Sequence, residues 1–371
     1  MEYISLASGA SYFQSPDEAV STAIDALQSG KTFYGPTEGT EGLRKAVCRR
    51  YEGEGATLDP EQVLITPGSK QALFNLFTIL LRQGDEVIVP TPAWFGFHEL
   101  MKYSCGVLKP LPTRLEEAYK LTPDMLRKSL TNSSRILLLT NPGNPTGKLY
   151  SKDELEELLE VVNEYPNLYL VSDEIYDHIT YSRPFTSVLS CEGAQREKTI
   201  VINGFSKNYA MSGWRIGYMV GPAELIKKCT DFQGSTLSGV SVFVQDAAQA
   251  TLHASDKALA PMIRTLKHNR ELMREALDQV PEVRYFEPEG AYYFFPDFSH
   301  YLSKGPSAGT PTGTGAGLWT YLREQYSLEL APGENFGAPG HARMSFAIET
   351  PRLTEAMQRL QDGLATYTDK K

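Results

Sequence analysis

The sequence predicts an α/β protein with a large domain built on a mostly parallel sheet and a smaller α+β domain. Three observations lead to this prediction: short apolar runs without polar alternation, helical patterns between these runs, and a change of pattern after about residue 225. Strands that are buried on both faces of a parallel sheet have such continuous apolar sequences. With 371 residues, the chain is long enough for two domains.

Five short runs have the composition of fully buried strands. Each is apolar from end to end and is followed by Pro, Gly, Asn, Asp or Ser residues, which commonly end strands. These runs are residues 63–65, 86–89, 136–139, 168–171 and 199–202.

Helical patterns separate several of these runs. Residues 69–82 carry an apolar stripe at helical spacing. Ser151 and Glu154 form a capping-box pattern, and the helix that they begin is expected to stop before Pro166. Strand–helix–strand repetition over residues 60–220 therefore implies an α/β domain with a mostly parallel sheet.

The pattern becomes mostly helical through residues 242–280, and a helix from Ala258 to about Val280 is expected to connect two domains. Strand-like pieces at 283–286 and 291–295 follow, with a final helix near 351–367. We assign residues 30–264 to the large domain, and residues 1–29 plus 265–371 to the small one. Residues 303–317 are rich in Gly, Pro, Ser and Thr and are expected to form a surface loop.

Composition restricts the possible partners and the compartment. The formal net charge of -9 argues against nucleic acid or an anionic membrane as the main partner. No apolar run is long enough to cross a bilayer, and the N-terminus lacks the pattern of a signal peptide. The four cysteines lack the spacing of a disulfide framework or a metal site. We therefore expect a cytoplasmic protein without a metal.

Polar residues follow the predicted strands at the point where each strand ends. Ligands of open α/β sheets bind at the carboxyl ends of strands. Gly68, Ser69 and Lys70 open a helix, whose free N–H groups attract phosphate, although an ordinary turn has the same pattern. Trp94 follows the next strand and is either a ring-stacking group or a core residue.

The next three strand ends add an amide, an acid, a hydroxyl and two cations. Asn144 lies in a turn with two prolines and two glycines, and Asp173 and Tyr176 follow the next strand. Lys207 comes shortly after the last apolar run, residues 199–202, and Arg215 lies eight residues beyond Lys207. Each residue alone fits a long turn, a solvated loop or an ordinary surface. Together they are the parts that a pyridoxal-phosphate (PLP) site needs.

These motifs, in this order, resemble those of class I aminotransferases, the fold-type I family of PLP enzymes. The residues of these motifs are most similar to those of the bacterial aspartate and broad amino-acid aminotransferase subgroup. The resemblance covers nearly the whole chain. The motifs are Tyr34-Gly35-Pro36 with Gly39 and Gly42, and residues 67–72, 141–147, 172–176, 206–207, 213–218 and 343–346.

The resemblance implies a role for each residue that faces the ring of the cofactor. Lys207 resembles the lysine that forms a Schiff base with PLP, and Asp173 the carboxylate that pairs with the pyridine nitrogen. Asn144 and Tyr176 resemble the pair that binds the phenolic oxygen, and Trp94 occupies the ring-stacking position. Lys207, Asp173 and Tyr176 are the expected catalytic residues.

The resemblance also implies a phosphate site, a substrate site and a homodimer. Tyr34 resembles a tyrosine that reaches the phosphate from the neighbouring subunit. Arg343 resembles the arginine that binds the α-carboxylate of the substrate, near Asn144 and Gly9. The phosphate residues on the chain's own side are expected to be Gly68, Ser69, Lys70 and Arg215.

The expected reaction moves an amino group from an L-amino acid to a 2-oxo acid through pyridoxamine phosphate. A C–S β-lyase or a cyclopropane-forming synthase on the same scaffold is the alternative. A PLP-binding sensor protein is not expected, because the sequence shows no DNA-binding segment. A nucleotide-binding protein is not expected either, because neither a GxGxxG nor a GxxxxGK[ST] motif is found. One departure is Gly204, where the family often has a hydroxyl residue, and Ser206 or backbone groups are expected to replace that hydroxyl. Another is residues 8–13, which lack the Glu-Pro pair of close relatives and leave the preferred substrate side chain open.

Overall fold

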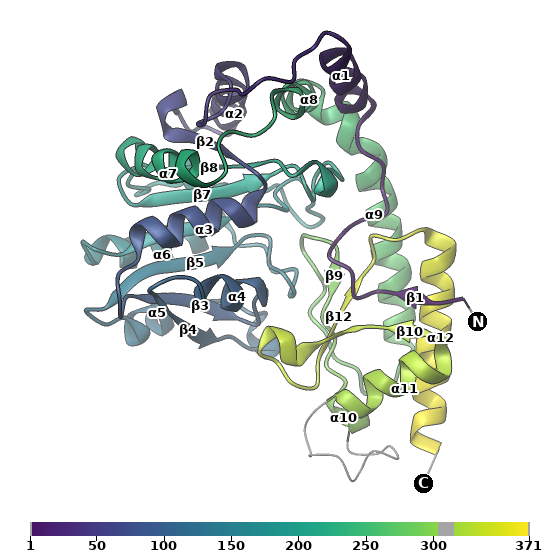
Figure 1. The fold of residues 1–371 in the computed structure, drawn as a ribbon. Helices are drawn as coiled ribbons and strands as arrows, with labels where there is room; N and C mark the ends of the chain where they lie inside the picture. The colour runs from purple at the N-terminus through teal and green to yellow at the C-terminus, as the bar shows by residue number, and fades with distance from the viewer. Residues whose placement is uncertain (1, 303–314, 370–371) are drawn as a thin grey trace.

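The structure is a computed structural model that describes residues 2–302 and 315–369 (Figure 1). Its centre is a seven-stranded sheet in which β4, β3, β5, β6 and β7 are parallel neighbours. At one edge, β8 is antiparallel to both β7 and β2. In sheet order, the strands are β2 (Val63–Thr66), β8 (Gly217–Val220), β7 (Thr199–Gly204), β6 (Tyr169–Asp173), β5 (Ser134–Thr140), β3 (Glu86–Thr91) and β4 (Val107–Pro112).

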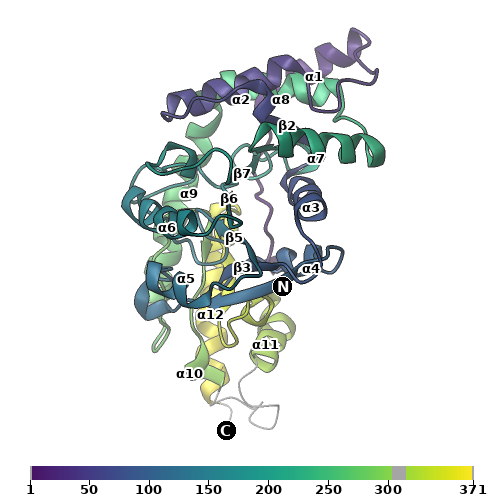
Figure 2. The same cartoon turned by 90° about the vertical axis from the view of Figure 1, so that its left-hand side faces the viewer.

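Alternate residues of the central strands belong to two separate apolar clusters. Ile136 and Leu138 of β5 pack with residues of α3 (Ser69–Leu80), α4 (Gly96–Met101) and α7 (Ala223–Thr236). Leu137 and Leu139 pack into the other cluster, with α2 (Glu41–Gly53), α5 (Pro123–Ser129) and α6 (Lys152–Glu164). Helices therefore cover both faces of the sheet (Figure 2), and the continuous apolar runs of the sequence are explained.

A smaller region holds a three-stranded antiparallel sheet, ordered β11 (Ala331–Pro332), β12 (Ala342–Ser345) and β9 (Tyr293–Phe294). Beside it, β1 (Ile4–Ser5) pairs in parallel with β10 (Leu328–Glu329). The helices α10 (Ser299–Leu302), α11 (Ala316–Tyr326) and α12 (Thr350–Asp369) complete this region. The predicted α/β architecture with a smaller α+β part is confirmed.

One long helix, α9 (Ser255–Asp278), runs from the end of α8 (Val242–His253) to α12, as predicted (Figure 1). The chain from β1 to α1 (Asp17–Gln28) also passes between the two regions, because β1 pairs with β10 while α1 packs on α8. The division of the chain at residues 30 and 264 stays a prediction. No helix within the described ranges is long and apolar enough to span a membrane.

Some predicted elements were wrong in detail. Residues 283–286 form no strand, because Arg284 makes only an isolated bridge to Asp297. Of residues 291–295, only β9 pairs, and Ala291 has a positive φ of 58° that interrupts extended backbone. The strands β4 and β8 were not predicted: β4 is an edge strand with two prolines, and β8 has only four residues. Of the predicted loop 303–317, residues 303–314 lie outside the described residues, and α11 begins at Ala316.

Candidate active site

A pocket of about 410 Å³ lies where the carboxyl ends of the central strands face the smaller region. Eight of the twelve predicted site residues line it, from segments that are far apart in the sequence. They are Gly9, Ser69, Trp94, Asn144, Asp173, Tyr176, Lys207 and Arg343. The structure therefore brings these eight residues together, while the role of each stays a prediction.

Lys207 lies on the turn that follows β7, and its side chain enters the pocket. Its Nζ donates a hydrogen bond of 2.6 Å to the carbonyl oxygen of Gly9. Burial and the nearby guanidinium of Arg343 lower the pKa of Lys207 to about 8, although the negative charge of Asp173 acts to raise it. A substantial fraction of this amine is therefore neutral, and nucleophilic, near neutral pH.

Asp173 ends β6 and is buried at the floor of the pocket. Burial raises the pKa of this carboxyl to about 7, opposed by the N–H of Ile175 and by the charge of Lys207. Its Oδ1 is buried and has no hydrogen-bond partner within the part of the chain that the structure describes. A buried polar atom without a partner is costly, so this oxygen fits a cationic or N–H group of a bound ring.

Tyr176 and Asn144 both line the pocket, and each is held by a residue of the smaller region. The hydroxyls of Tyr176 and Tyr293 are 2.9 Å apart. The Oδ1 of Asn144 accepts a hydrogen bond of 3.1 Å from Nη1 of Arg343. That bond fixes the orientation of the amide and leaves its NH₂ group free to donate elsewhere.

Arg343 is buried on β12, where its guanidinium is held from several directions. Nη2 donates to the carbonyl oxygen of Ala7 at 2.6 Å, and the ring centroids of Tyr293 and Phe336 are 4.4 and 4.9 Å from Cζ. Within residues 2–302 and 315–369, no carboxylate forms a salt bridge with Arg343. A rigid, buried guanidinium without a carboxylate partner fits a carboxylate of a ligand.

The turn before α3 brings an arginine against the backbone. Gly68 has a φ of 88°, and a Cβ there would lie 2.6 Å from Nη2 of Arg215, so only glycine permits this approach. Arg215 donates to the carbonyl oxygens of Ser212 at 2.9 Å and Pro67 at 3.2 Å. Because no side chain caps α3, its first N–H groups are free to bind an anion.

Lys70 and Trp94 adjoin this turn, with Nζ of Lys70 5.2 Å from the centroid of the Trp94 ring. Trp94 itself lines the pocket and makes an edge contact with Phe97. Gly204 is packed tightly, since a Cβ there would lie 2.9 Å from Cα of Gly217. This contact explains why a hydroxyl residue is absent at 204, and replacement by Ser206 stays a prediction.

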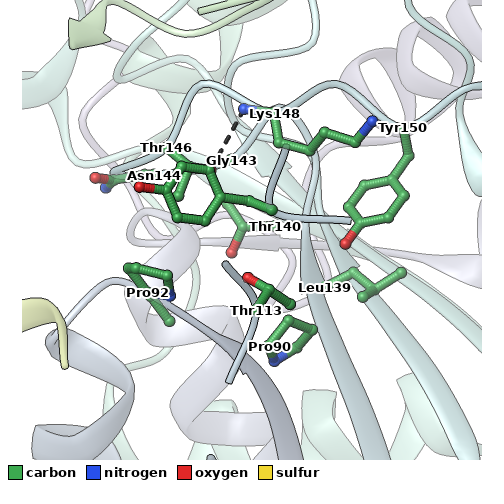
Figure 3. A pocket seen from close by; sticks show the side chains of 12 residues that line it. Pro90, Pro92, Thr113, Leu139, Thr140, Gly143, Asn144, Thr146, Lys148 and Tyr150 are labelled. Atoms are coloured by element: carbon green, nitrogen blue, oxygen red, sulfur yellow. Dashed lines mark hydrogen bonds between the residues drawn. The ribbon is translucent and has the colours of Figure 1, made fainter. Parts of the chain in front are cut away.

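A second, smaller cavity lies behind Asn144 (Figure 3). Asn144 and Thr140 line both cavities. This cavity has a volume of about 30 Å³, which is enough for about two water molecules at ~10–15 Å³ each. The other polar residues on its surface are Thr113, Tyr119, Thr146, Lys148 and Tyr150. The Asn144 loop therefore has polar groups on both sides.

The structure also shows residues that the sequence did not single out. Tyr293 and Tyr292 both donate to the carbonyl oxygen of Gly9, at 3.3 and 2.8 Å, yet the aromatic run 292–295 was interpreted as core strand. Phe95 and Asn335 line the pocket without any motif. Four predicted residues do not line the pocket. Gly68, Lys70 and Arg215 lie at the turn before α3 or beside it, whereas Tyr34 is 93% exposed.

Comparisons with known proteins agree with this geometry. The family profile described as "Aminotransferase class I and II" matches residues 1–360. A bifunctional aspartate aminotransferase and glutamate/aspartate-prephenate aminotransferase of Petunia hybrida is 34% identical over 98% of this chain and 77% of its own length. The aspartate aminotransferase of Geobacillus stearothermophilus is 32% identical over 97% of this chain and 90% of its own.

Solved structures give the same result. The aspartate aminotransferase of Rhizobium meliloti superposes with a TM-score of 0.93 at 32% identity, covering 98% of this chain and 91% of that one. An aromatic aminotransferase from Pyrococcus horikoshii OT3 gives a TM-score of 0.92 at 31% identity, covering 98% and 96%. These relatives do not favour the lyase or synthase alternative. The chain therefore belongs to the class I and II aminotransferase family and is a PLP-dependent aminotransferase of fold type I.

Proposed function

We propose that Lys207, Asp173 and Arg343 carry the amino transfer, with Lys207 as the residue that holds the cofactor covalently. One observation supports this proposal above the others. Within the described ranges, a half-buried amine, a buried carboxylate oxygen without a hydrogen-bond partner and a buried guanidinium without a carboxylate partner meet in a single pocket. Three such groups are expensive to bury unless a ligand with matching charges completes them.

The residues around the pocket fit PLP in type and position. Asp173 would bind the pyridine nitrogen, while Asn144 and Tyr176 would bind the phenolic oxygen. Trp94 would stack on the ring. Gly68, Ser69, Lys70 and Arg215 would hold the phosphate at the start of α3. When bound, the cofactor supplies an electron sink for the negative charge that develops at the α-carbon of the substrate.

Lys207 is also proposed as the base that moves the proton of the α-carbon. Its lowered pKa of about 8 makes the neutral amine available close to physiological pH, where a general base works best. Because the side chain is largely enclosed by Gly9 and the pocket, water has limited access to the transferred proton.

Arg343 is proposed to bind the α-carboxylate of every substrate. Its guanidinium plane is fixed by Ala7 and by two aromatic rings, so a bidentate contact requires little reorganisation. Since Nη1 also contacts Asn144, the same arginine links the substrate carboxylate to the proposed cofactor site.

We also propose a cytoplasmic homodimer in which Tyr34 reaches the phosphate of the partner's site. Tyr34 and Phe33 are 93% and 82% exposed, which is unusual for neighbouring aromatic residues. The preceding helix α1 adds Val20, Ile24 and Leu27, which are exposed apolar residues at helical spacing. The four cysteines are free, which fits a reducing compartment.

The half-reaction tests the proposed function directly. The PLP-loaded protein is mixed with L-amino acids one at a time, and the visible absorbance of the cofactor is followed. We expect the absorbance to change with an amino acid and to return when a 2-oxo acid is added. Release of pyruvate and ammonia from a cysteine conjugate, without that return, would contradict the proposal.

Sedimentation at micromolar concentration tests the dimer. We expect a dimer, and we expect Phe33→Asp to produce monomers with weakened cofactor binding. A wild-type monomer with full activity would contradict this part of the proposal.

A further inference from the structure

The turn after β6 carries two buried carboxylates besides Asp173. Of its residues 173–177, Asp173, Ile175 and Tyr176 line the pocket, whereas Glu174 and Asp177 do not. Glu174 is fully buried, and Asp177 is 3% exposed. A buried carboxyl group needs hydrogen-bond partners. The partners of Glu174 and those of Asp177 belong to different segments of the chain.

Asp177 binds three side chains from three different segments. Its Oδ2 accepts from Nδ2 of Asn203 at 2.6 Å and from the guanidinium of Arg50 in α2. Its Oδ1 accepts from Nδ2 of Asn208 at 2.6 Å. Asn208 makes a second hydrogen bond with the same turn: its Oδ1 accepts from the N–H of His178 at 3.4 Å. Asp177 therefore joins the sheet, α2 and the residue next to Lys207.

The carboxylate of Asp177 is held in its charged form. Burial raises its pKa, but Arg50 and His178 oppose that effect and, with the hydrogen bonds from Arg50 and Asn203, leave the pKa below its usual value. The other groups around the pair are Glu54, 3.6 Å from Arg50, and the hydroxyl of Tyr218, which accepts from Arg50 at 2.6 Å. Charge-assisted hydrogen bonds of this kind are short and directional, so they fix geometry as well as charge.

We infer that Asp177 is a positioning residue, which holds the turn of Lys207 against the turn of Asp173 and Tyr176. The bridge from Asp177 to Asn208 connects these turns directly behind the pocket. This inference rests on the proposed roles of Lys207 and Asp173, because it concerns the distance between those two groups. Small changes in such distances are costly: about 1 Å of misplacement can lower a rate by about 100-fold.

Glu174 provides a matched control on the same turn. Its carboxylate accepts from Oγ of Ser187 at 2.8 Å and from the N–H of Val188 at 3.0 Å. Those residues belong to a short 3₁₀ segment, Val188–Ser190, and its N-cap, which contribute nothing to the pocket lining. Burial raises the pKa of Glu174 well above its usual value. Replacing it by glutamine therefore disturbs an equally buried carboxyl group without touching the turn of Lys207.

The first experiment compares Asp177→Asn with Glu174→Gln in the full-length, PLP-loaded protein. Both variants are expected to unfold at lower denaturant concentration than wild type. For Asp177→Asn we expect kcat to fall about 10- to 100-fold with little change in KM, because Arg343 lies on the other side of the pocket. The pH midpoint of the cofactor's visible absorbance is expected to move by at least about half a unit, since that midpoint depends on the distance between Lys207 and Asp173. Glu174→Gln is expected to keep the wild-type midpoint and a kcat within about twofold.

The second experiment breaks only the bridge to the lysine turn. Asn208→Ala leaves the bonds of Asp177 to Arg50 and Asn203 in place, and we expect it to reproduce the change in kcat and in the absorbance midpoint. The double variant with Asp177→Asn is expected to lose less than the product of the two single losses, as for residues that act through one contact.

Two results would overturn the inference. One is an Asn208→Ala protein with the kcat and midpoint of wild type. The other is an equal loss in Glu174→Gln, which would mean that a change at any buried carboxyl group on this turn has the same effect. Neither result concerns the proposed function itself, which fails separately if Lys207→Ala retains turnover.

Discussion

The sheet side of the pocket and the side formed by the smaller region are built in different ways. On the sheet side, Asn144, Asp173 and Lys207 follow three neighbouring parallel strands, so the sheet itself brings them together. On the other side, Gly9 and Arg343 come from segments that are more than 300 residues apart and meet only through tertiary packing. The residues proposed to bind the cofactor are thus held by a continuous sheet, whereas the position of those proposed to bind the substrate depends on how the N-terminal segment packs.

The carbonyl oxygen of Gly9 is where the two sides meet. It accepts hydrogen bonds from Nζ of Lys207, from Tyr292 and from Tyr293. A substitution on the sheet side is therefore expected to change the chemical step, and one on the other side to change substrate binding. The predictions below test this difference.

The largest effect is expected at the sheet side, from Lys207→Ala. Turnover is expected to fall by more than about 1000-fold, because general base catalysis alone contributes about 10²–10⁴-fold. The measurements are steady-state rates and the visible spectrum after incubation with PLP. Lys198→Ala serves as the control, since Lys198 precedes the same strand at its opposite end and binds only backbone carbonyls. Near wild-type turnover in Lys207→Ala would contradict the account.

The next effect is expected from Asp173→Asn, which keeps the shape and removes the charge. We expect kcat to fall about 100- to 1000-fold, the range for losing one preorganised electrostatic group, while PLP still binds. Rapid mixing of loaded protein with an amino acid measures the affected step. If the rate stayed near that of wild type, Asp173 would have no electronic role.

On the opposite side, Arg343→Ala is expected to raise KM by about 100-fold for every amino acid. Losing one partner of a buried charge pair costs about 2–5 kcal/mol, and each 1.4 kcal/mol corresponds to about tenfold. The exposed Arg284, which pairs with Asp297 in the same region, is the control. An unchanged KM would show that the α-carboxylate binds elsewhere.

The pH dependence of cofactor loading tests the lowered pKa of Lys207. Only the neutral amine reacts, so loading of the cofactor-free protein is expected to level off above pH 8 and to slow by about tenfold for each unit below it. An ordinary lysine, with its pKa of 10.5, would still gain rate at pH 10. Stopped-flow absorbance between pH 6 and 10 separates the two curves, and a rate that keeps rising to pH 10 would contradict the assigned burial effect.

The smallest effect is expected from Tyr293→Phe, which removes one hydroxyl from the junction at Gly9. We expect kcat/KM to fall about fivefold, since a neutral hydrogen bond contributes about 0.5–1.5 kcal/mol. Tyr301→Phe is the control, because its hydroxyl binds the carbonyl oxygen of Pro281 away from the pocket. Equal effects in both variants would remove Tyr293 from the site.

The same difference between the two sides explains how much the sequence could predict. Asp173 and Lys207 directly follow apolar runs, and the rule that ligands bind at the carboxyl ends of parallel strands places them together. Motif order then extended the prediction to Arg343. No local pattern marks Tyr293 or Asn335, because they reach the pocket only through the packing of the smaller region.

The fold was predictable to a similar degree. Continuous apolar runs identified five of the seven strands of the large sheet, whereas the edge strand β4 contains Pro110 and Pro112 and lacks that signal. The run 283–286 has strand composition but no continuous partner, and pairing is a tertiary property. The bridge from Asp177 to Asn208 was also beyond sequence reasoning, since nothing in either motif shows that the two side chains meet.

The identity of the residue that holds PLP is the central claim, and chemical fixation tests it most directly. The loaded protein is reduced with borohydride, which makes the bond between cofactor and amine permanent, and its peptides are then sequenced by mass spectrometry. We predict that the mass of the reduced cofactor is found on Lys207 alone. Cofactor mass on Lys70 or another lysine, with Lys207 unmodified, would contradict the account.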